Sequence, residues 1–194
     1  MTNFHVLAQG GSAIGTAENK AVLEFADKSI RKVKKIFIAD ADRDLAVFRI
    51  EAPAEGLPYL DIEGRKDVPE KGTKIAVVGC PLGVGIVSSH GEISGTTKGG
   101  KNSDVDKLLI TAPINPGSSG SPVVDLEGIV LGVAQGAVFS AAKTSQVAIA
   151  ISELRELIEE RKKAAPEDED IGAIEKSPPE GAHNRGKGED LPRS

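Results

Sequence analysis

Three serines stand close together in the segment INPGSSGSPVVD, residues 114–125, among glycines and prolines that are typical of a turn. A serine hydroxyl is a weak nucleophile at neutral pH unless a nearby base takes its proton, and that base must be oriented by a third group. Histidine is the usual base, and the chain has only three histidines. The segment is therefore either an ordinary turn or the site of a nucleophilic serine. The second interpretation requires that one of the histidines can act as the base.

Two of the three histidines are candidates for such a base. His183 lies in a polar C-terminal stretch that we expect to be disordered, so it is set aside. His5, in TNFHVL, and His90, in SSHGE, are equal candidates by composition, although an isolated histidine is usually a surface or capping residue.

Short apolar segments predict the strands that must position these side chains. Segments rich in Val, Ile and Phe and separated by charged or turn-forming residues are typical of β-strands. We expect strands at 21–26, 32–40, 44–50, 73–80, 85–95, 107–113, 121–125, 128–138 and 146–151. Residues 52–72, with three prolines and three glycines, are expected to connect two groups of strands. The expected fold class is therefore all-β, with one linker between two strand-rich parts.

One helix is expected, over residues 152–165, where Ser152 is a suitable N-cap and Pro166 ends the segment. The apolar residues on one face of this helix predict that it docks on the β-strands: Ile151, Leu154, Leu157 and Ile158. Residues 166–194 carry eight acidic and four basic side chains and few apolar ones. They are expected to form a disordered acidic tail.

Charge and cysteine content exclude several classes of protein. Residues 1–165 carry 21 acidic and 20 basic side chains, and this balance argues against a nucleic-acid groove, which needs a basic excess. No apolar stretch approaches the length of a membrane span, and no signal peptide opens the sequence. The single cysteine, Cys80, excludes an intramolecular disulfide and a cysteine-based zinc site. Because Cys80 follows the apolar run IAVVG, we expect a buried thiol at a strand end.

The motifs TNFHVL, DRDLAVFRI and INPGSSGSPVV, followed by GIVLGVA, resemble the trypsin-like serine proteases. The resemblance is to the bacterial heat-shock (HtrA/Deg-like) protease domain, with its TNxHVV, DLAVLKI and INPGNSGGPL motifs, and it covers residues 2 to 158. The order and the separations agree, since His5 and Asp44 are 39 residues apart and Asp44 and Ser119 are 75 apart. The resemblance implies a chymotrypsin-like double β-barrel and a serine endopeptidase that acts on polypeptides with neither metal nor cofactor.

The resemblance implies a role for each residue of the site. Ser119 would be the nucleophile, His5 its base, and Asp44 the group that orients His5. Asp40 and Asp42 compete for this third role, but only Asp44 occupies the DLAVF position, directly before a predicted strand. The backbone N–H groups of Gly117 and Ser119 would form the oxyanion hole. Gly117 and Gly120 can adopt backbone angles closed to other residues, so the loop can turn sharply around Ser119.

The resemblance also places the pocket for the substrate residue before the scissile bond. Its expected lining comes from the segment before the nucleophile and from a later strand: Pro113, Ile114, Asn115, Pro116, Val133, Ala134 and Gln135. None of these side chains carries a charge that could pair with a substrate Arg or Lys. The sequence therefore predicts cleavage after small or medium aliphatic residues.

In this family further strands precede the TNxHV motif, and we therefore expect residues 1–51 to form an incomplete first barrel and residues 73–151 the second barrel. His5 would then lie on a loosely held terminal segment. Met1 stands where relatives carry valine or another aliphatic residue, which suggests a misassigned start and a longer native protein, compatible with export and with an oligomer. The alternative function is an inactive or truncated protease-like domain that binds peptides without efficient turnover.

Overall fold

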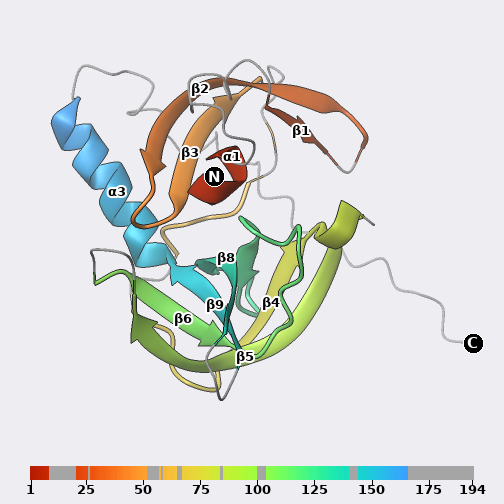
Figure 1. Ribbon diagram of the computed structural model, residues 1–194, viewed down its shortest axis with the longest axis vertical. Coiled ribbons are helices and arrows are strands. Elements are labelled where there is room, and N and C mark those ends of the chain that lie inside the picture. Colours follow the sequence, from red (N-terminus) through yellow and green to blue (C-terminus); the bar gives the residue numbers. More distant parts are fainter. Residues whose placement is uncertain are drawn as a thin grey trace, which may run out of the picture.

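The computed structural model describes residues 1–8, 21–25, 27–51, 57, 59–64, 67–83, 85–99, 104–139 and 144–165. Within them the chain forms a three-stranded sheet, a closed barrel and a long helix that touches both (Figure 1). The elements in chain order are α1 (Phe4–Ala8), β1 (Val22–Glu24), β2 (Ile30–Asp40), β3 (Leu45–Ile50), β4 (Lys74–Gly79), the 3-10 turn η1 (Pro81–Gly83), β5 (Val87–Lys98), β6 (Asp106–Ile110), β7 (Pro122–Val124), β8 (Val130–Phe139), β9 (Thr144–Ala150) and α3 (Ile151–Ala164).

The first sheet is antiparallel in the order β1-β2-β3. Its long central strand, β2, has two register shifts against β3, one between Val33 and Lys35 and one between Ile36 and Ile38. Register shifts of this kind bend a strand and increase its twist. The strand β2 accordingly curves over β3 in Figure 1, and the tight turn between them ends at Asp44.

The second unit is a closed six-stranded barrel in the order β4-β5-β6-β9-β8-β7. Side chains alternate between the two faces of a strand, so every second residue points into the barrel. Ile75 and Val77 in β4 and Leu108 and Ile110 in β6 do so, and they form the barrel core together with residues of the other strands. Closure leaves no free edge in this unit, which gives the loops at its rim a fixed support.

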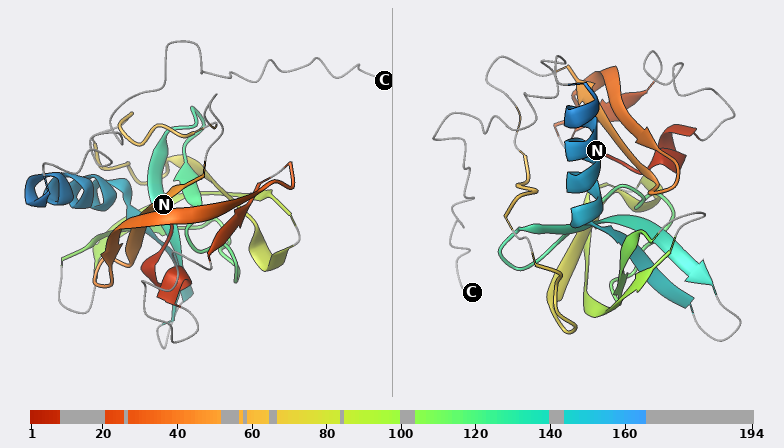
Figure 2. Two further views of the ribbon diagram at one scale, coloured as in Figure 1. Left: turned by 90° about the horizontal axis from the view of Figure 1, so that it is seen from above. Right: turned by 90° about the vertical axis from the view of Figure 1, so that its left-hand side faces the viewer.

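A second core lies between the first sheet, the barrel and helix α3. Its buried members come from all three parts: Phe37, Ile38, Leu45, Val105, Val124, Val130, Val133, Ile149, Ile151, Leu154, Leu157 and Ile158. Figure 2 (right) shows α3 running from the barrel up beside the first sheet, and the helix contacts β2, β8 and β9. Helix and shared core therefore hold the two β-units together.

The structure confirms the all-β fold class with a C-terminal helix and gives each expected strand a counterpart within a few residues. The expected N-cap is wrong: the helix begins at Ile151, and its N-cap is Ala150 with extended backbone and no side-chain cap. The reason is that the chain passes from β9 into α3 with no intervening loop. Cys80 is exposed rather than buried, because β4 ends at Gly79, before the thiol. The proposed tail, 166–194, and His183 lie outside the described residues.

Candidate active site

Asp44 closes the turn between β2 and β3 with an unusual backbone conformation. Its φ of 56° lies in the left-handed region that residues other than glycine rarely adopt. Two hydrogen bonds to its carbonyl oxygen support this conformation, one from Asn3 Nδ2 and one from Phe4 N, each of 3.1 Å. The N-terminal segment therefore fixes the backbone of Asp44 from outside the turn.

The N-terminal segment is itself held by backbone hydrogen bonds. Thr2 and Ala46 exchange two N–H···O bonds of 2.9 Å, which add this segment to β3 as a short antiparallel bridge. Thr2 also lies against the loop after Ser119, since a Cβ atom on Gly120 would come within 2.3 Å of Thr2 Oγ1. The expectation of a loosely held segment is thus wrong for the described residues 1–8. Asn3 belongs to the TNFHVL motif and is completely buried, a role that its residue type did not indicate.

His5 and Asp44 form a tightly bonded pair. The imidazole Nδ1 lies 2.8 Å from Asp44 Oδ2 and 3.0 Å from Oδ1, and the backbone N–H of His5 donates to Oδ1 over 2.9 Å. A carboxylate only accepts hydrogen bonds, so Nδ1 is the protonated nitrogen of the neutral ring and Nε2 is left as an acceptor. The His5 side chain is 38% exposed and that of Asp44 14%. This is the state that a general base requires: an oriented ring with a free nitrogen at the surface.

The other candidates for these two roles have different partners. Asp40 Oδ1 accepts from the backbone N–H of Arg43 over 2.7 Å, so it belongs to the turn itself. Asp42 is exposed. His90 lies on β5 with its Nε2 2.9 Å from Ser88 Oγ. Among the described residues, only Asp44 is hydrogen-bonded to His5.

The loop between β6 and β7 presents one of its three serines. Ser118 and Ser121 are buried, at 5% and 8% exposure, whereas Ser119 is partly exposed. The flanking glycines have φ values of 93° (Gly117) and 84° (Gly120), which a side chain would strain. The two glycines thus turn the loop sharply around Ser119, as the sequence predicts.

Some backbone N–H groups of this loop donate hydrogen bonds within the described structure, and others do not. Those of Ser118, Gly120 and Ser121 donate to backbone oxygens at 2.9, 2.9 and 3.1 Å. Those of Gly117 and Ser119 have no hydrogen-bond acceptor within the part of the chain that the structure describes. Free backbone donors beside a serine are what an oxyanion hole needs, and these are the two donors that the sequence analysis named.

Among the described residues, no hydrogen bond joins Ser119 to His5. The Ser119 Oγ donates instead to the backbone oxygen of Gln135 in β8, over 3.3 Å. Hydrogen bonds between a nucleophile and its base are often long or poorly aligned before substrate binds.

Gln135 connects Ser119 to the carboxylate of Asp44, and the sequence did not predict this connection. Its side-chain Nε2 donates to Asp44 Oδ2 over 3.0 Å, and its Oε1 accepts from Lys107 Nζ over 3.0 Å. From the sequence, Gln135 is expected in the substrate pocket and Lys107 has no expected role. No local sequence pattern predicts these hydrogen bonds, because they join residues of β6, β8 and the turn between β2 and β3.

The remaining residues of the expected substrate pocket are placed differently from one another. Ile114, Val133 and Ala134 are buried in the two cores, while Pro113, Asn115 and Pro116 are exposed. Val133 and Ala134 have no exposed surface at all, so Gln135 is the one of these three β8 residues that reaches the surface. The lining of the pocket stays a prediction.

The described residues contain no group of three or more His, Cys, Asp and Glu side chains suited to hold a metal ion. Among the same residues, no helix has the length and apolar character needed to cross a membrane.

The closed barrel, the first sheet and the C-terminal helix form a chymotrypsin-like fold. The family model for the trypsin-like peptidase domain matches residues 1–133, and the chain belongs to this family. Within the family its relatives are of the HtrA type. It is 35% identical over 138 residues to serine protease HTRA4 of Homo sapiens and 33% identical over 139 residues to putative serine protease HhoB of Synechocystis. Each match covers 69% of this chain but only 27% and 30% of these curated relatives.

Solved structures share the fold. HtrA-type protease AlgW with a decapeptide superposes with a TM-score of 0.63 at 24% identity, over 84% of this chain and 47% of that chain. The serine endoprotease from Yersinia pestis gives a TM-score of 0.63 at 23% identity, over 84% of this chain and 53% of that one. These likenesses support the double β-unit architecture.

Proposed function

We propose that this chain is a serine endopeptidase domain in which Ser119, His5 and Asp44 act as nucleophile, base and orienting carboxylate. The observation that carries the proposal is the 2.8 Å contact between His5 Nδ1 and Asp44 Oδ2, which leaves Nε2 free to accept a proton. Ser119, in a loop with two free backbone donors, supplies the nucleophile and the oxyanion hole. Polypeptide is the proposed substrate, since an HtrA-type relative of known structure carries a decapeptide.

The reaction then follows from these positions. Ser119 Oγ turns from the Gln135 carbonyl, attacks the scissile carbonyl carbon and gives its proton to His5 Nε2. The carbonyl oxygen becomes an oxyanion and accepts hydrogen bonds from Gly117 N and Ser119 N. The C–N bond breaks as His5 returns the proton to the leaving amine, and an ester to Ser119 remains. Water, deprotonated by His5, attacks this ester, and the carboxylic acid and the Ser119 hydroxyl are released.

The reactivity of Ser119 is the direct test. The 194-residue chain should be labelled by a fluorophosphonate probe, and Ser119→Ala should abolish labelling, because the probe forms its bond to an activated serine oxygen. Ser118→Ala is the matched control, since it removes the neighbouring buried hydroxyl and should label like the wild type. Labelling that survives in Ser119→Ala, or its absence from folded wild-type protein, would contradict the proposal.

A second function is favoured by one observation. The hydroxyl of Ser119 donates to Gln135 O rather than to His5, which suits a domain that binds peptide without efficient turnover. Such a domain would bind a decapeptide but would leave both peptide and fluorophosphonate probe unreacted. Mass spectrometry of the incubated peptide together with the labelling assay separates the two functions.

We further propose cleavage after small or medium aliphatic residues, because no charged side chain occurs among the proposed pocket residues. Peptides with Val or Ala before the scissile bond should be cleaved faster than matched peptides with Arg or Lys. A peptide library read by mass spectrometry measures the ratio. A preference for Arg or Lys would overturn this specificity while leaving the serine mechanism standing.

A further inference from the structure

A lysine reaches the Asp44 carboxylate through the side chain of one glutamine. Lys107 Nζ donates to Gln135 Oε1 over 3.0 Å, and Gln135 Nε2 donates to Asp44 Oδ2 over 3.0 Å. Both bonds lie in partly buried surroundings, where hydrogen bonds are stronger than in open water. We propose that Lys107 and Gln135 form a positioning pair that orients the Asp44 carboxylate and adds a positive charge behind it. The proposal rests on the function proposed above for Asp44.

The strand register explains how Gln135 comes to face Asp44. In β8, Ala134 is paired with Ala148 of β9, while Gly136 is paired with Val147, so Gln135 is the extra residue of a bulge. Gly136 has a φ of 149°, which fits the irregular backbone there. A bulge breaks the alternation of side chains and re-aims one of them. The side chain of Gln135 therefore leaves the barrel surface in the direction of the first sheet.

Lys107 is placed to meet Gln135 from the other side of β9. It is paired with Ile149, which is paired in turn with Val133 of β8, so these three residues form a row across the barrel. Strands β6 and β8 are two strand spacings apart, about 10 Å, since neighbouring strands lie about 4.8 Å apart. Only long side chains span this distance, and lysine and glutamine together do so.

The hydrogen-bonding capacity of each partner fixes the direction of the amide. A carboxylate only accepts and an ammonium only donates, so the Gln135 NH₂ must face Asp44 and its C=O must face Lys107. Turning the amide over would place two acceptors together at one end and two donors at the other. Lys107 thus prevents the flipped amide and keeps the donor on Asp44 Oδ2.

The charge of Lys107 acts on the same carboxylate. Oδ1 and Oδ2 of Asp44 accept from His5 N, His5 Nδ1 and Gln135 Nε2. The guanidinium of the neighbouring Arg43 is directed away, to carboxylates of β2 and α3. Lys107 is then the cation linked to Asp44 by hydrogen bonds in the described structure. It places a positive charge behind the Asp44 carboxylate, one glutamine side chain away.

Substitutions at Lys107 test both proposed effects, the orientation of the Asp44 carboxylate and the positive charge behind it. Lys107→Met, which keeps the length of the side chain, should slow the labelling of Ser119 about five-fold, as expected for one lost hydrogen bond. It should also move the acidic midpoint of the pH–rate profile upward, because the positive charge behind Asp44 is removed. Lys107→Arg should restore both values. Gln135→Leu keeps the carbonyl that Ser119 contacts and should slow labelling at least as much as Lys107→Met.

Lys74→Met is the matched control, since Lys74 is an exposed lysine of the same barrel, paired with Glu92. It should change neither the rate nor the midpoint. The proposal is overturned if Lys107→Met labels with wild-type rate and midpoint. It is equally overturned if Lys107→Met and Lys107→Arg are slowed alike, because a merely structural role would not distinguish the two.

Failure of the proposed function gives a different pattern. If the folded wild-type protein is not labelled at all, the endopeptidase proposal fails, and the positioning pair is judged by NMR titration of the His5 ring, identified with His5→Gln. A titration midpoint that rises in Lys107→Met and returns in Lys107→Arg supports the pair. A midpoint that is the same in all three proteins overturns it.

Discussion

Replacing Asp44 by asparagine should slow the labelling of Ser119 by about four orders of magnitude while the protein stays folded. Asparagine has nearly the shape of aspartate, so the core beneath the turn is unchanged. Its left-handed backbone conformation is also retained, because asparagine tolerates positive φ values as aspartate does. The loss therefore comes from hydrogen bonding at one carboxylate.

The donors around Asp44 leave no place for an amide NH₂ group. Oδ1 accepts from the backbone N–H of His5, and Oδ2 accepts from His5 Nδ1 and Gln135 Nε2. Whichever way the amide of the substituted side chain is turned, its NH₂ faces at least one of these donors. When it faces His5, Nδ1 must become an acceptor, and the ring proton moves to Nε2. That nitrogen then cannot take the proton of Ser119.

Asp42→Asn is the matched control for this prediction. Asp42 belongs to the same turn and is exposed, so its replacement removes a similar charge without touching His5. The second-order rate constant for labelling and the thermal unfolding midpoint should both be measured for the two variants. A loss of less than about ten-fold in Asp44→Asn, or an equal loss in Asp42→Asn, would remove Asp44 from the proposed mechanism.

The nucleophile loop was predictable because its signals are local. Glycines at positions 117 and 120 favour the positive φ values that the structure has. Two serines lie between them, and the resemblance of PGSSGSP to the family motif indicated Ser119 rather than Ser118. The strands were equally predictable, since alternating apolar residues indicate which face of a strand is buried. The pairing of His5 with Asp44 was different: it joins residues 39 positions apart, and the order of the motifs, rather than any local physical pattern, indicated it.

The positioning pair of Lys107 and Gln135 could not be derived from the sequence. Its bond to Asp44 spans 91 positions, and the bond between its members spans 28. Both depend on a one-residue bulge in β8, and a one-residue change of register reverses which face a side chain occupies. The pattern of apolar residues also did not predict where strands end, as the exposed Cys80 shows. Helix α3 gives a third case, since the acidic residue of its first turn, Glu153, is buried.

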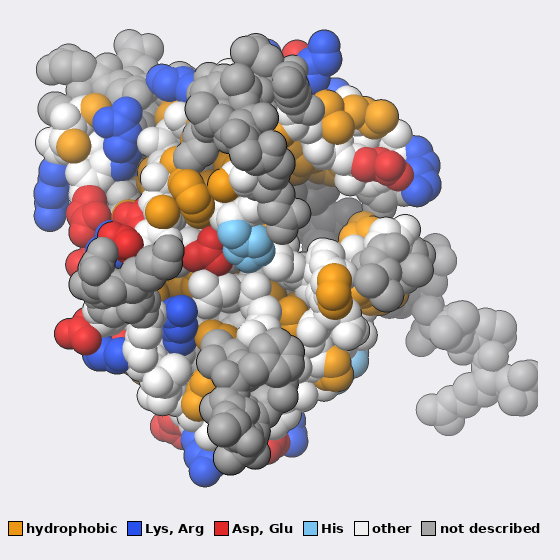
Figure 3. Space-filling model, viewed as in Figure 1, with side chains coloured by type: hydrophobic (Ala, Val, Ile, Leu, Met, Phe, Trp, Pro, Cys, Tyr) orange, Lys and Arg blue, Asp and Glu red, His pale blue; other side chains and the backbone are white. Residues whose placement is uncertain are grey.

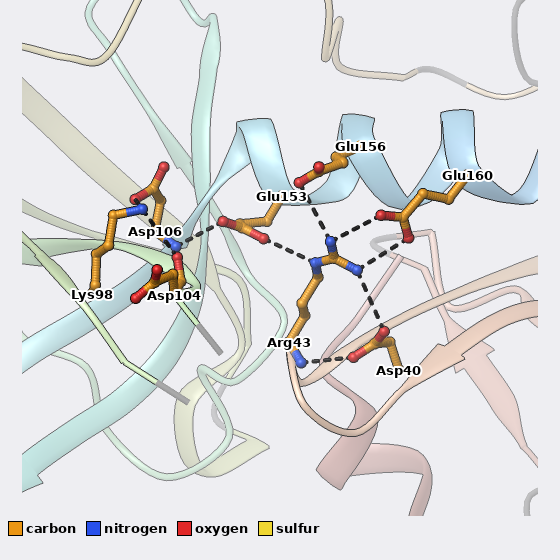
Figure 4. Close-up of polar contacts among 8 residues, drawn as sticks. All are labelled: Asp40, Arg43, Lys98, Asp104, Asp106, Glu153, Glu156 and Glu160. Carbon is orange, nitrogen blue, oxygen red and sulfur yellow. Dashed lines mark hydrogen bonds and ion pairs between the residues drawn. The ribbon is translucent and has the colours of Figure 1, made fainter. Parts of the chain in front are cut away.

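The burial of Glu153 gives the second large prediction, which concerns Arg43. Arg43→Met should lower the free energy of unfolding by about 3 kcal/mol, because it leaves a buried carboxylate without its cation. Figure 4 shows the arrangement: the carboxylate of Asp40, at the end of β2, and carboxylates from three positions of α3 surround one guanidinium. Acidic side chains also gather on this flank of the surface in Figure 3. The turn that carries Asp44 is thus tied to α3 by the residue next to Asp44.

The ion pairs of Arg43 contribute unequally to the free energy of unfolding. Arg43 Nε donates to Glu153 over 3.0 Å, and two of its nitrogens donate to the two oxygens of Glu160 over 3.1 and 3.2 Å. Burial alone would lower the pKa of Arg43, but the bonds to Glu160 and Glu153 outweigh it and raise the pKa. Glu160 and Glu156 are 52% and 61% exposed, so water solvates them when Arg43 is gone. The side chain of Glu153 is 9% exposed, and among the described residues only the N–H of Asp106 would remain as its donor, so most of the loss comes from Glu153.

A double variant tests this division. Arg43→Met with Glu153→Met removes both charges and fills their space with apolar atoms, and it should recover most of the stability lost in Arg43→Met. Glu156→Gln, which changes an exposed partner of the same guanidinium, should cost less than about 0.5 kcal/mol. Urea unfolding followed by circular dichroism gives the value for each variant and for the wild type. If the double variant is no more stable than Arg43→Met, the buried charge of Glu153 is not the cause.

The same variants show whether α3 positions Asp44 or only stabilises the fold. Arg43 and Asp44 are consecutive, and loss of the guanidinium frees the turn from Glu153 and Glu160 at one end while Asn3 and Phe4 still hold it at the other. Labelling should therefore be compared at low temperature, where Arg43→Met is still folded. A rate that falls in proportion to the unfolded fraction means that the hydrogen bonds from the N-terminal segment are sufficient to place the carboxylate. A rate that falls in the fully folded variant and returns in the double variant means that the helix takes part in orienting His5 through Asp44.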